Sequence, residues 1–118
     1  MNPGMDSDRV FLEHIRECIE RIREYTGGDR STFYASRLVH DAVVRNLQTL
    51  AESTQHLSAA IKSTENDVPW QAIAGFRNVL VHGYLGIDLD AVWSVVDRDL
   101  PELATAAGRM ARSVEASG

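Results

Sequence analysis

The sequence holds a single cysteine, Cys18, and no long apolar run. One cysteine excludes an internal disulfide and any cysteine-rich metal site, and we expect Cys18 to be a small core residue. No apolar stretch approaches the roughly 20 residues that a membrane span needs. Residues 1–10 are polar and lack the apolar core of a secretory signal. We therefore expect a cytoplasmic protein, and the spacing of its histidines and carboxylates indicates neither a metal nor a cofactor.

Positive charge is also scarce, with 12 Lys and Arg against 17 Asp and Glu, a net charge of −5. This balance argues against a chain that coats nucleic acid broadly, for which a basic surface is expected. The acidic excess lies in residues 1–29 and 85–118, and the centre of the chain is less acidic. A nucleic-acid site in this chain would therefore be a local cleft.

The length of 118 residues and the 44% hydrophobic content predict one domain over residues 1–118, with a core at about residues 8–112. A first helix is indicated from an N-cap at Asp6 or Ser7 to Gly27–Gly28. Its apolar positions recur at steps of three and four. They are Phe11, Ile15, Cys18, Ile22 and Tyr25.

Residues 31–62 contain neither glycine nor proline, and their apolar positions keep helical spacing. With Ser31 as its cap, this element either bends or begins with a separate short turn near Phe33 and Tyr34. Its polar face holds Asp41 and Arg45, which we interpret either as a salt-bridged surface or as the border of a dimer cleft. The histidines of the first half are expected at the surface. They are His14, His40 and His56.

A further helix is predicted from Pro69 and Trp70 to Gly83, because proline is tolerated in a first turn and glycine ends helices. Asp88 is the expected cap of the next one. Pro101 either begins a last helix or kinks the one before it, and the pattern fades in a polar tail at 113–118. No alternation typical of strands occurs, so the predicted fold is all-α, an up-and-down bundle of four to five helices.

The densest chemistry lies in residues 76–87, which contain Arg77, Asn78, His82 and Tyr84. On a helix Asn78 and His82 share a face, whereas Arg77 lies about 140° from His82. The arginine stem could curl round, the helix could fray at Gly83, or a second copy of the helix could supply the neighbour. We favour the last, a symmetric dimer in which Gly75 permits close approach.

These residue types suit phosphodiester cleavage. Histidine exchanges a proton near neutral pH, and the arginine fork matches phosphate oxygens. His82 would act as general base or acid, Arg77 would stabilise phosphate charge, and Asn78 would orient His82 or the substrate. The plainer interpretation is a helix C-terminus with a solvated arginine and histidine, and spacing alone does not decide between the two.

The pattern Arg-x4-His-x-Tyr, formed by Arg77, His82 and Tyr84, resembles the signature of HEPN-domain ribonucleases. The longer string RNVLVHGYLGID is similar to the HepT toxin group among them. The resemblance covers about residues 8–108. Its flanking features are Tyr25–Thr26, the helix-like segment 41–53, Pro69–Trp70, Trp93 and Leu100–Pro101.

This resemblance implies a helical, homodimeric, metal-independent RNase toxin of a toxin-antitoxin pair, with Arg77 and His82 as catalytic residues. It also implies an antitoxin similar to a minimal nucleotidyltransferase, which silences the toxin by transferring AMP to Tyr84. The competing hypothesis is a non-catalytic helical module that docks such a nucleotidyltransferase without cutting RNA. A third is a dimeric structural adaptor with an inert motif.

Overall fold

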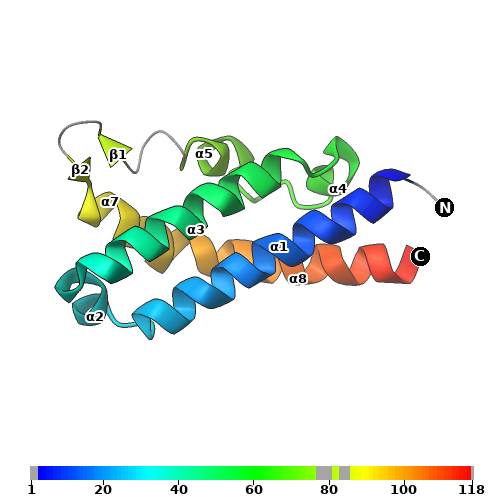
Figure 1. Cartoon of the computed structure of the whole chain (residues 1–118). Coiled ribbons are helices and arrows are strands. Elements are labelled where there is room, and N and C mark those ends of the chain that lie inside the picture. Colours follow the sequence, from blue (N-terminus) through cyan, green and yellow to red (C-terminus); the bar gives the residue numbers. More distant parts are fainter. Residues whose placement is uncertain (1–2, 77–80, 83–85, 118) are drawn as a thin grey trace.

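Three long helices form the body of the protein in the computed structural model, which describes residues 3–76, 81–82 and 86–117. They are α1 (Pro3–Thr26), α3 (Arg37–Gln55) and α8 (Leu100–Ser117), and α1 packs against both of the others (Figure 1). Side chains are described for residues 7–76 and 88–116. None of the described helices is long and apolar enough to cross a bilayer.

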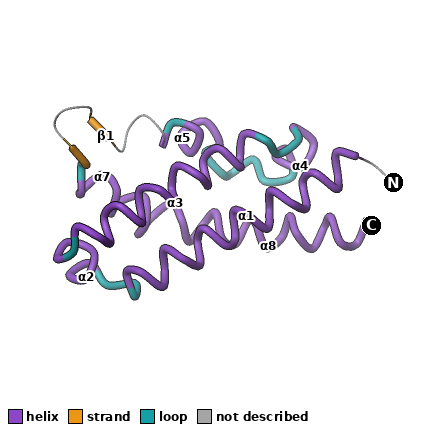
Figure 2. The backbone as a smooth tube through the Cα atoms, viewed as in Figure 1, coloured by secondary structure: helices purple, strands orange, loops and turns teal. Residues whose placement is uncertain are grey.

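Shorter elements connect the long helices: α2 (Arg30–Ala35), α4 (Ala59–Ser63), α5 (Trp70–Ala74) and α7 (Leu89–Ser94). In the described part of the chain, extended structure is limited to a ladder of β1 (Val81–His82) with β2 (Gly86–Ile87), drawn in orange in Figure 2. The ladder lies at the end of the bundle away from the start of α1 and the end of α8 (Figure 1). The all-α class predicted from the sequence is confirmed, apart from this ladder.

The core lies where α1 meets α3 and α8. Burial of one large apolar side chain stabilises a fold by about 1.5–3 kcal/mol, so this seam supplies most of the stabilisation. The predicted tail at 113–118 is wrong, because α8 continues to Ser117 with Val114 buried. The core residues of the three helices are Leu12, Ile15, Cys18, Ile19, Ile22, Val43, Val44, Leu47, Leu50, Ala51, Leu100, Leu103, Ala106, Ala107, Met110 and Val114.

Helix α1 differs from its prediction at both of its ends. It begins at Pro3, before the predicted caps, and Tyr25 is 39% exposed, because the buried face turns toward Ile19 and Thr26. Asp8 is buried and accepts hydrogen bonds from Ser58 N at 2.8 Å and Ser58 Oγ at 2.7 Å. This contact spans 50 residues and ties α1 to the start of α4.

Two of the connections follow the turn chemistry of the sequence. Gly27 and Gly28 have φ of +61° and +69°, a conformation that favours glycine, so the predicted end of α1 is confirmed. The predicted cap Ser31 is wrong. Asp29 caps α2 instead, with its carboxylate accepting from Ser31 N at 3.3 Å and Thr32 Oγ1 at 2.9 Å, since aspartate is among the strongest N-caps.

The region 31–62 is divided into three helices, and the predicted separate start near Phe33 and Tyr34 is confirmed. Ser36 ends α2 and caps α3 by accepting from Val39 N at 3.3 Å. Ser58 caps α4 by accepting from Ile61 N at 3.2 Å. Two serines with local capping bonds therefore interrupt what periodicity alone presents as one helix.

Asp88 caps α7 as predicted, with Oδ1 accepting from Ala91 N at 3.1 Å. The chain then passes through the π-helical turn η2 (Val95–Asp99) directly into α8. Pro101 lies in the first turn of α8. Because proline has no N–H to donate, it interrupts the regular hydrogen-bond ladder at the point where the π-turn adjusts its register.

Candidate functional site

Helix α5 leads into the predicted motif, and its predicted start at Pro69 and Trp70 is confirmed. Ile73 N donates to Pro69 O at 3.0 Å. Ile73 and Phe76 are 1% and 5% exposed, and α5 packs against α3. Because Phe76 directly precedes Arg77, a buried side chain fixes the chain at the entrance to the motif.

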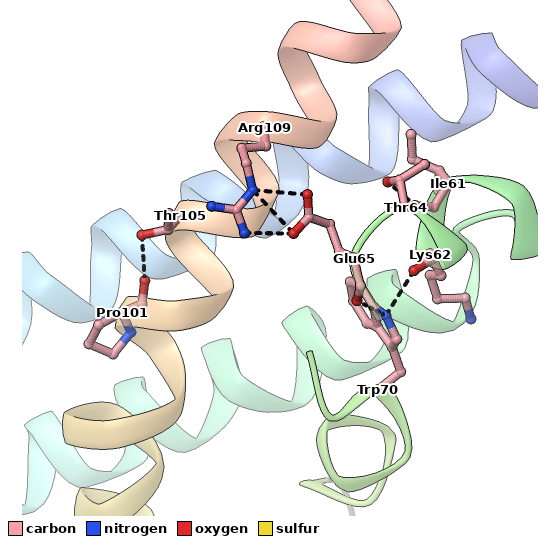
Figure 3. Close-up of polar contacts among 8 residues, drawn as sticks. All are labelled: Ile61, Lys62, Thr64, Glu65, Trp70, Pro101, Thr105 and Arg109. Carbon is pink, nitrogen blue, oxygen red and sulfur yellow. Dashed lines mark hydrogen bonds and ion pairs between the residues drawn. The ribbon is translucent and has the colours of Figure 1, made fainter. Parts of the chain in front are cut away.

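A polar clamp holds the loop before α5 against α8 (Figure 3). The indole Nε1 of Trp70 donates to Lys62 O at 3.3 Å and Glu65 O at 3.1 Å. The Glu65 carboxylate binds Arg109 in a forked arrangement, with Nε to Oε2 at 2.9 Å and Nη2 to Oε1 at 2.6 Å. Such two-point pairing fixes orientation as well as distance.

The clamp pairs an exposed arginine with a largely covered glutamate. The Glu65 side chain is only 12% exposed, and its hydrogen bonds from Arg109 hold the pKa of the carboxyl group below its usual value. The same pair raises the pKa of Arg109. Both groups are therefore charged at neutral pH, and α8 fixes the position from which α5 starts.

The helix predicted from Pro69 to Gly83 is not continuous and does not reach His82. Helix α5 ends at Ala74 with Gly75 as its C-cap, Phe76 is helical again, and His82 belongs to β1. Glycine is a poor helix former and a frequent helix end, which explains the break at Gly75. The predicted helical position of His82 is therefore wrong, whereas Arg77 and Asn78 lie outside the described residues.

The close approach of a second copy at Gly75 stays a prediction, and the described atoms show only its surroundings within one chain. Its φ is −75°, an ordinary value. A Cβ there would meet Ala72 O at 3.4 Å and Gln71 O at 3.7 Å. Gly75 therefore ends α5.

His82 pairs with Gly86 and Val81 with Ile87 in an antiparallel ladder. Three residues connect the paired positions 82 and 86, a short hairpin connection. The ladder brings the backbone on either side of Tyr84 together, although nothing in the sequence alternates over more than a few residues. Sequence periodicity misses a ladder this short.

Beyond the ladder, α2 ties down the start of α7. The Tyr34 hydroxyl donates to the Asp90 carboxylate, which holds the pKa of Tyr34 above its usual value. The Arg30 guanidinium lies 5.2 Å from the centre of the Tyr34 ring. Phe33 and Trp93 contact with ring centroids 5.5 Å apart. The chain is thus anchored to α8 before the motif and to α2 after it.

Three predicted site residues, Arg77, Asn78 and Tyr84, lie outside the described residues, and His82 is described only by its backbone position in β1. Their mutual geometry stays a prediction. Among the described residues, no three His, Cys, Asp or Glu side chains are grouped to hold a metal ion.

Asp41 and Arg45 are both exposed on the outer face of α3. Arg45 lines two adjoining hollows of about 430 Å³ and 370 Å³. The first lies between α1 and α3, and the second continues along α3. The position of Asp41 and Arg45 at the border of a dimer cleft stays a prediction.

The predicted surface position of His40 is wrong, whereas the predicted core position of Cys18 is confirmed. His40 is half-buried, its ring centroid lies 5.1 Å from that of Phe33, and its Nε2 has no hydrogen-bond partner in the described part of the chain. Short helix α2 covers a face that periodicity assigns to solvent. Cys18 is buried, and this burial raises the pKa of its thiol.

Sequence reasoning missed the anchors on both sides of the motif. Glu65 and Arg109 are 44 residues apart, and Tyr34 and Asp90 are 56 apart. No local pattern links residues at such separations. The one available signal is Trp70, because a buried indole N–H needs an acceptor.

Comparisons with known proteins relate most of this chain to ribonucleases of one family. The family model described as HepT-like: Ribonuclease HepT-like matches residues 15–110. A Methanocaldococcus jannaschii protein named gamma-glutamylcyclotransferase and putative RNase is 35% identical over 96 residues, which are 80% of this chain and 43% of that protein. No solved structure matches this chain significantly.

Two shorter relatives are covered almost entirely. A putative RNase of Caldanaerobacter subterraneus subsp. tengcongensis is 32% identical over 100 residues, which are 84% of this chain and 89% of that protein. A probable ribonuclease HepT of Thermococcus cleftensis is 32% identical over 98 residues, which are 82% of this chain and 89% of that protein. The family match over residues 15–110 thus includes all of α3, residues 76–88, and the parts of α1 and α8 that lie nearest to them in the sequence.

Proposed function

Because this chain belongs to the HepT-like family, we propose that it is a metal-independent ribonuclease toxin of a toxin-antitoxin pair, with Arg77 and His82 as its catalytic residues. The observation that carries this proposal is the family match over residues 15–110, which includes the complete Arg-x4-His-x-Tyr motif. The names of the Caldanaerobacter and Thermococcus relatives support RNA as the substrate.

The proposed active unit is a homodimer of HEPN-like up-and-down helical bundles in the cytoplasm. Two motif segments face one another across the two-fold axis, and Asp41 and Arg45 border the cleft between them. The exposure of both side chains on α3 is compatible with that role. A local cleft also suits a chain whose net charge is −5, since most of its surface repels RNA.

In the proposed reaction His82 takes the proton of a ribose 2′-hydroxyl, whose oxygen attacks the adjacent phosphorus. The bond to the 5′-oxygen breaks, and the partner subunit's His82 protonates that leaving oxygen. A 2′,3′-cyclic phosphate and a 5′-hydroxyl result. Arg77 binds the phosphate and stabilises the negative charge that develops on it. Asn78 supports the site by orienting His82 or by donating to the substrate.

The anchors on either side of the motif suit this chemistry. Catalysis of this kind depends on preorganised groups, and a segment tied down at both ends loses less conformational entropy when RNA binds. The Trp70–Glu65–Arg109 clamp and the Tyr34–Asp90 hydrogen bond supply such ties without entering the motif itself.

The proposed partner is an antitoxin similar to a minimal nucleotidyltransferase, which transfers AMP to the Tyr84 hydroxyl. The added phosphate brings a negative charge and bulk near Arg77. It competes with the phosphate of RNA for the same guanidinium, so the modified toxin is silent.

The direct test is RNA cleavage by the purified protein in the presence of a metal chelator. Wild type is expected to cut, and Arg77→Ala and His82→Ala are each expected to be inactive. If the cleft is shared between subunits, mixing the two inactive variants restores activity in the mixed dimers. Equal cutting by wild type and both variants contradicts the proposal. A wild type that cuts nothing but accepts AMP on Tyr84 identifies a non-catalytic module instead.

A further inference from the structure

The outer face of α1 and α3 carries a trough that shares Arg45 with the proposed border of the dimer cleft and extends from there onto α1. Its first hollow, of about 430 Å³, is lined by Arg21 and Tyr25 of α1 together with residues of α3, with two guanidinium groups and no carboxylate. Its second hollow, of about 370 Å³, shares Arg45 and Thr49 with the first. The α3 residues of the first hollow are Ala42, Arg45, Asn46 and Thr49.

Helix geometry explains why these side chains form a line. Arg21 and Tyr25 are four residues apart on α1, and the α3 residues recur at steps of three and four, so each set lies on one helical face. From Ala42 to Glu52 the trough follows α3 for about 15 Å at 1.5 Å per residue. That length matches about four stacked nucleotides at roughly 3.4 Å each.

We propose that this trough binds single-stranded RNA, with Tyr25 stacking on a base and with Arg21 and Arg45 on phosphates. The inference rests on the proposed ribonuclease function for its substrate class. Tyr25 is 39% exposed, and an exposed ring beside two cations is the combination that single-stranded nucleic acid uses. In Figure 1, α3 lies between α1 and α5, the helix that precedes the motif. A strand leaving the motif therefore crosses α3 to reach the trough.

The two ends of the trough differ in charge. Arg45 has no ion-pair partner among the described residues, and Arg21 has a loose one, Glu17, at 3.9 Å. Glu52 lines only the second hollow. Phosphates are therefore attracted at the Tyr25 end and repelled at the Glu52 end. Removal of the Glu52 charge is expected to tighten RNA binding, which is the opposite of the effect of removing either arginine.

The rival occupant of this face is a second protein chain. Leu38 lies one turn before Ala42 on α3 and is 79% exposed. The lining of the hollows favours RNA, because it is polar and cationic with one aromatic ring, whereas the centre of a protein interface is depleted of charge. A protein occupant is distinguished from RNA by the oligomeric state of the Tyr25→Ala variant.

The chain offers a matched control. Arg21 and Arg23 are both 53% exposed and both lie near a glutamate of α1, at 3.9 Å and 4.0 Å. Arg21 lines the trough, whereas Arg23 lines a separate hollow on the α8 side of α1. Removal of either arginine changes the net charge equally, so a difference between the two variants reports the trough.

The experiment measures binding of a fluorescent RNA pool of random sequence, about 16 nucleotides long, by fluorescence anisotropy in the His82→Ala background, where cleavage is blocked. Tyr25→Ala is expected to weaken binding about tenfold, and Tyr25→Phe, which keeps the ring, is expected to bind as before. Arg21→Ala is expected to weaken binding and to reduce the salt dependence by roughly 0.7 in log–log slope. Arg23→Ala is expected to change neither.

Equal effects of Arg21→Ala and Arg23→Ala, or unchanged binding by Tyr25→Ala, overturn the inference. If light scattering shows that Tyr25→Ala changes the molar mass of the assembly, this face binds a protein chain, and the inference is likewise overturned. The two proposals fail separately. If wild type cuts no RNA but the trough variants lose RNA binding, the trough inference stands and the ribonuclease proposal fails. If wild type cuts RNA but the trough variants bind RNA normally, the ribonuclease proposal stands and the trough inference fails.

Discussion

The long helices and the motif segment are held in place by different interactions. Helices α1, α3 and α8 meet along a seam of fully buried apolar side chains. The described residues on either side of the motif are held by the buried side chain of Phe76 and by polar contacts to α8 and α2. The first region is therefore sensitive to lost volume, and the second to lost charge and hydrogen bonds.

The largest expected effect separates a buried leucine from an exposed one on the same helix. Leu47 is 0% exposed and Leu38 is 79% exposed on α3. Leu47→Ala is expected to lower the free energy of unfolding by about 2–5 kcal/mol, because it leaves a cavity. Leu38→Ala is expected to change it by less than about 0.5 kcal/mol. Urea unfolding measures both, and similar losses would show that the seam is not what holds the bundle.

A smaller effect is expected at the polar contact within the long-helix region. Asp8→Ala leaves the N–H and hydroxyl of Ser58 without their acceptor, which costs about 1–3 kcal/mol. Glu13→Ala, an exposed change on the same helix, is the control and is expected to be neutral. Urea unfolding of both variants measures the difference. A neutral Asp8→Ala would mean that α1 and α4 are joined by apolar contact alone.

The smallest expected effect on stability lies at the clamp before α5, and it depends on pH. The folded-state pKa of Glu65 is below its unfolded value, so its contribution is present above the unfolded pKa and is lost as pH falls through the folded pKa. Glu65→Gln is expected to lower the Tm at neutral pH, and the difference from wild type is expected to close below about pH 4. The measurement is thermal unfolding across a pH series.

The control for the clamp is Glu20→Gln, which removes the exposed pair with Arg23 at 4.0 Å and is expected to leave the Tm unchanged at every pH. A constant gap for Glu65→Gln at all pH values would contradict the role of the charged pair. RNA cleavage is expected to fall further with Glu65→Gln than the stability loss explains, because the clamp positions the start of α5.

The two regions also differ in how far the sequence predicts them. Spacing of apolar residues locates α1, α3 and α8, because a buried helical face leaves a local pattern. It misplaces Tyr25, since the burial of a side chain at the border of the face depends on which helices pack beside it. Ser36 and Ser58 divide residues 31–62 through capping bonds that compete with the helical period.

Around the motif, residue types were more informative than periodicity. The assignment of Arg77 and His82 rests on their chemistry and on the family resemblance, not on the secondary structure, and it stays a prediction. The helix predicted through His82 failed because Gly75 ends α5 and because β1 pairs with β2 across three residues. The Glu65–Arg109 contact was unpredictable, since two residues 44 positions apart share no local signal.

The most direct test of the central claim compares two histidines in one cleavage assay with chelator. His82→Ala is expected to lose about 10²–10⁴-fold in cleavage rate, with the Tm of wild type. His56→Ala, which changes an exposed histidine stacked on Phe11, is expected to cut like wild type. Cleavage by His82→Ala at the wild-type rate would contradict the assignment of this motif as the ribonuclease site.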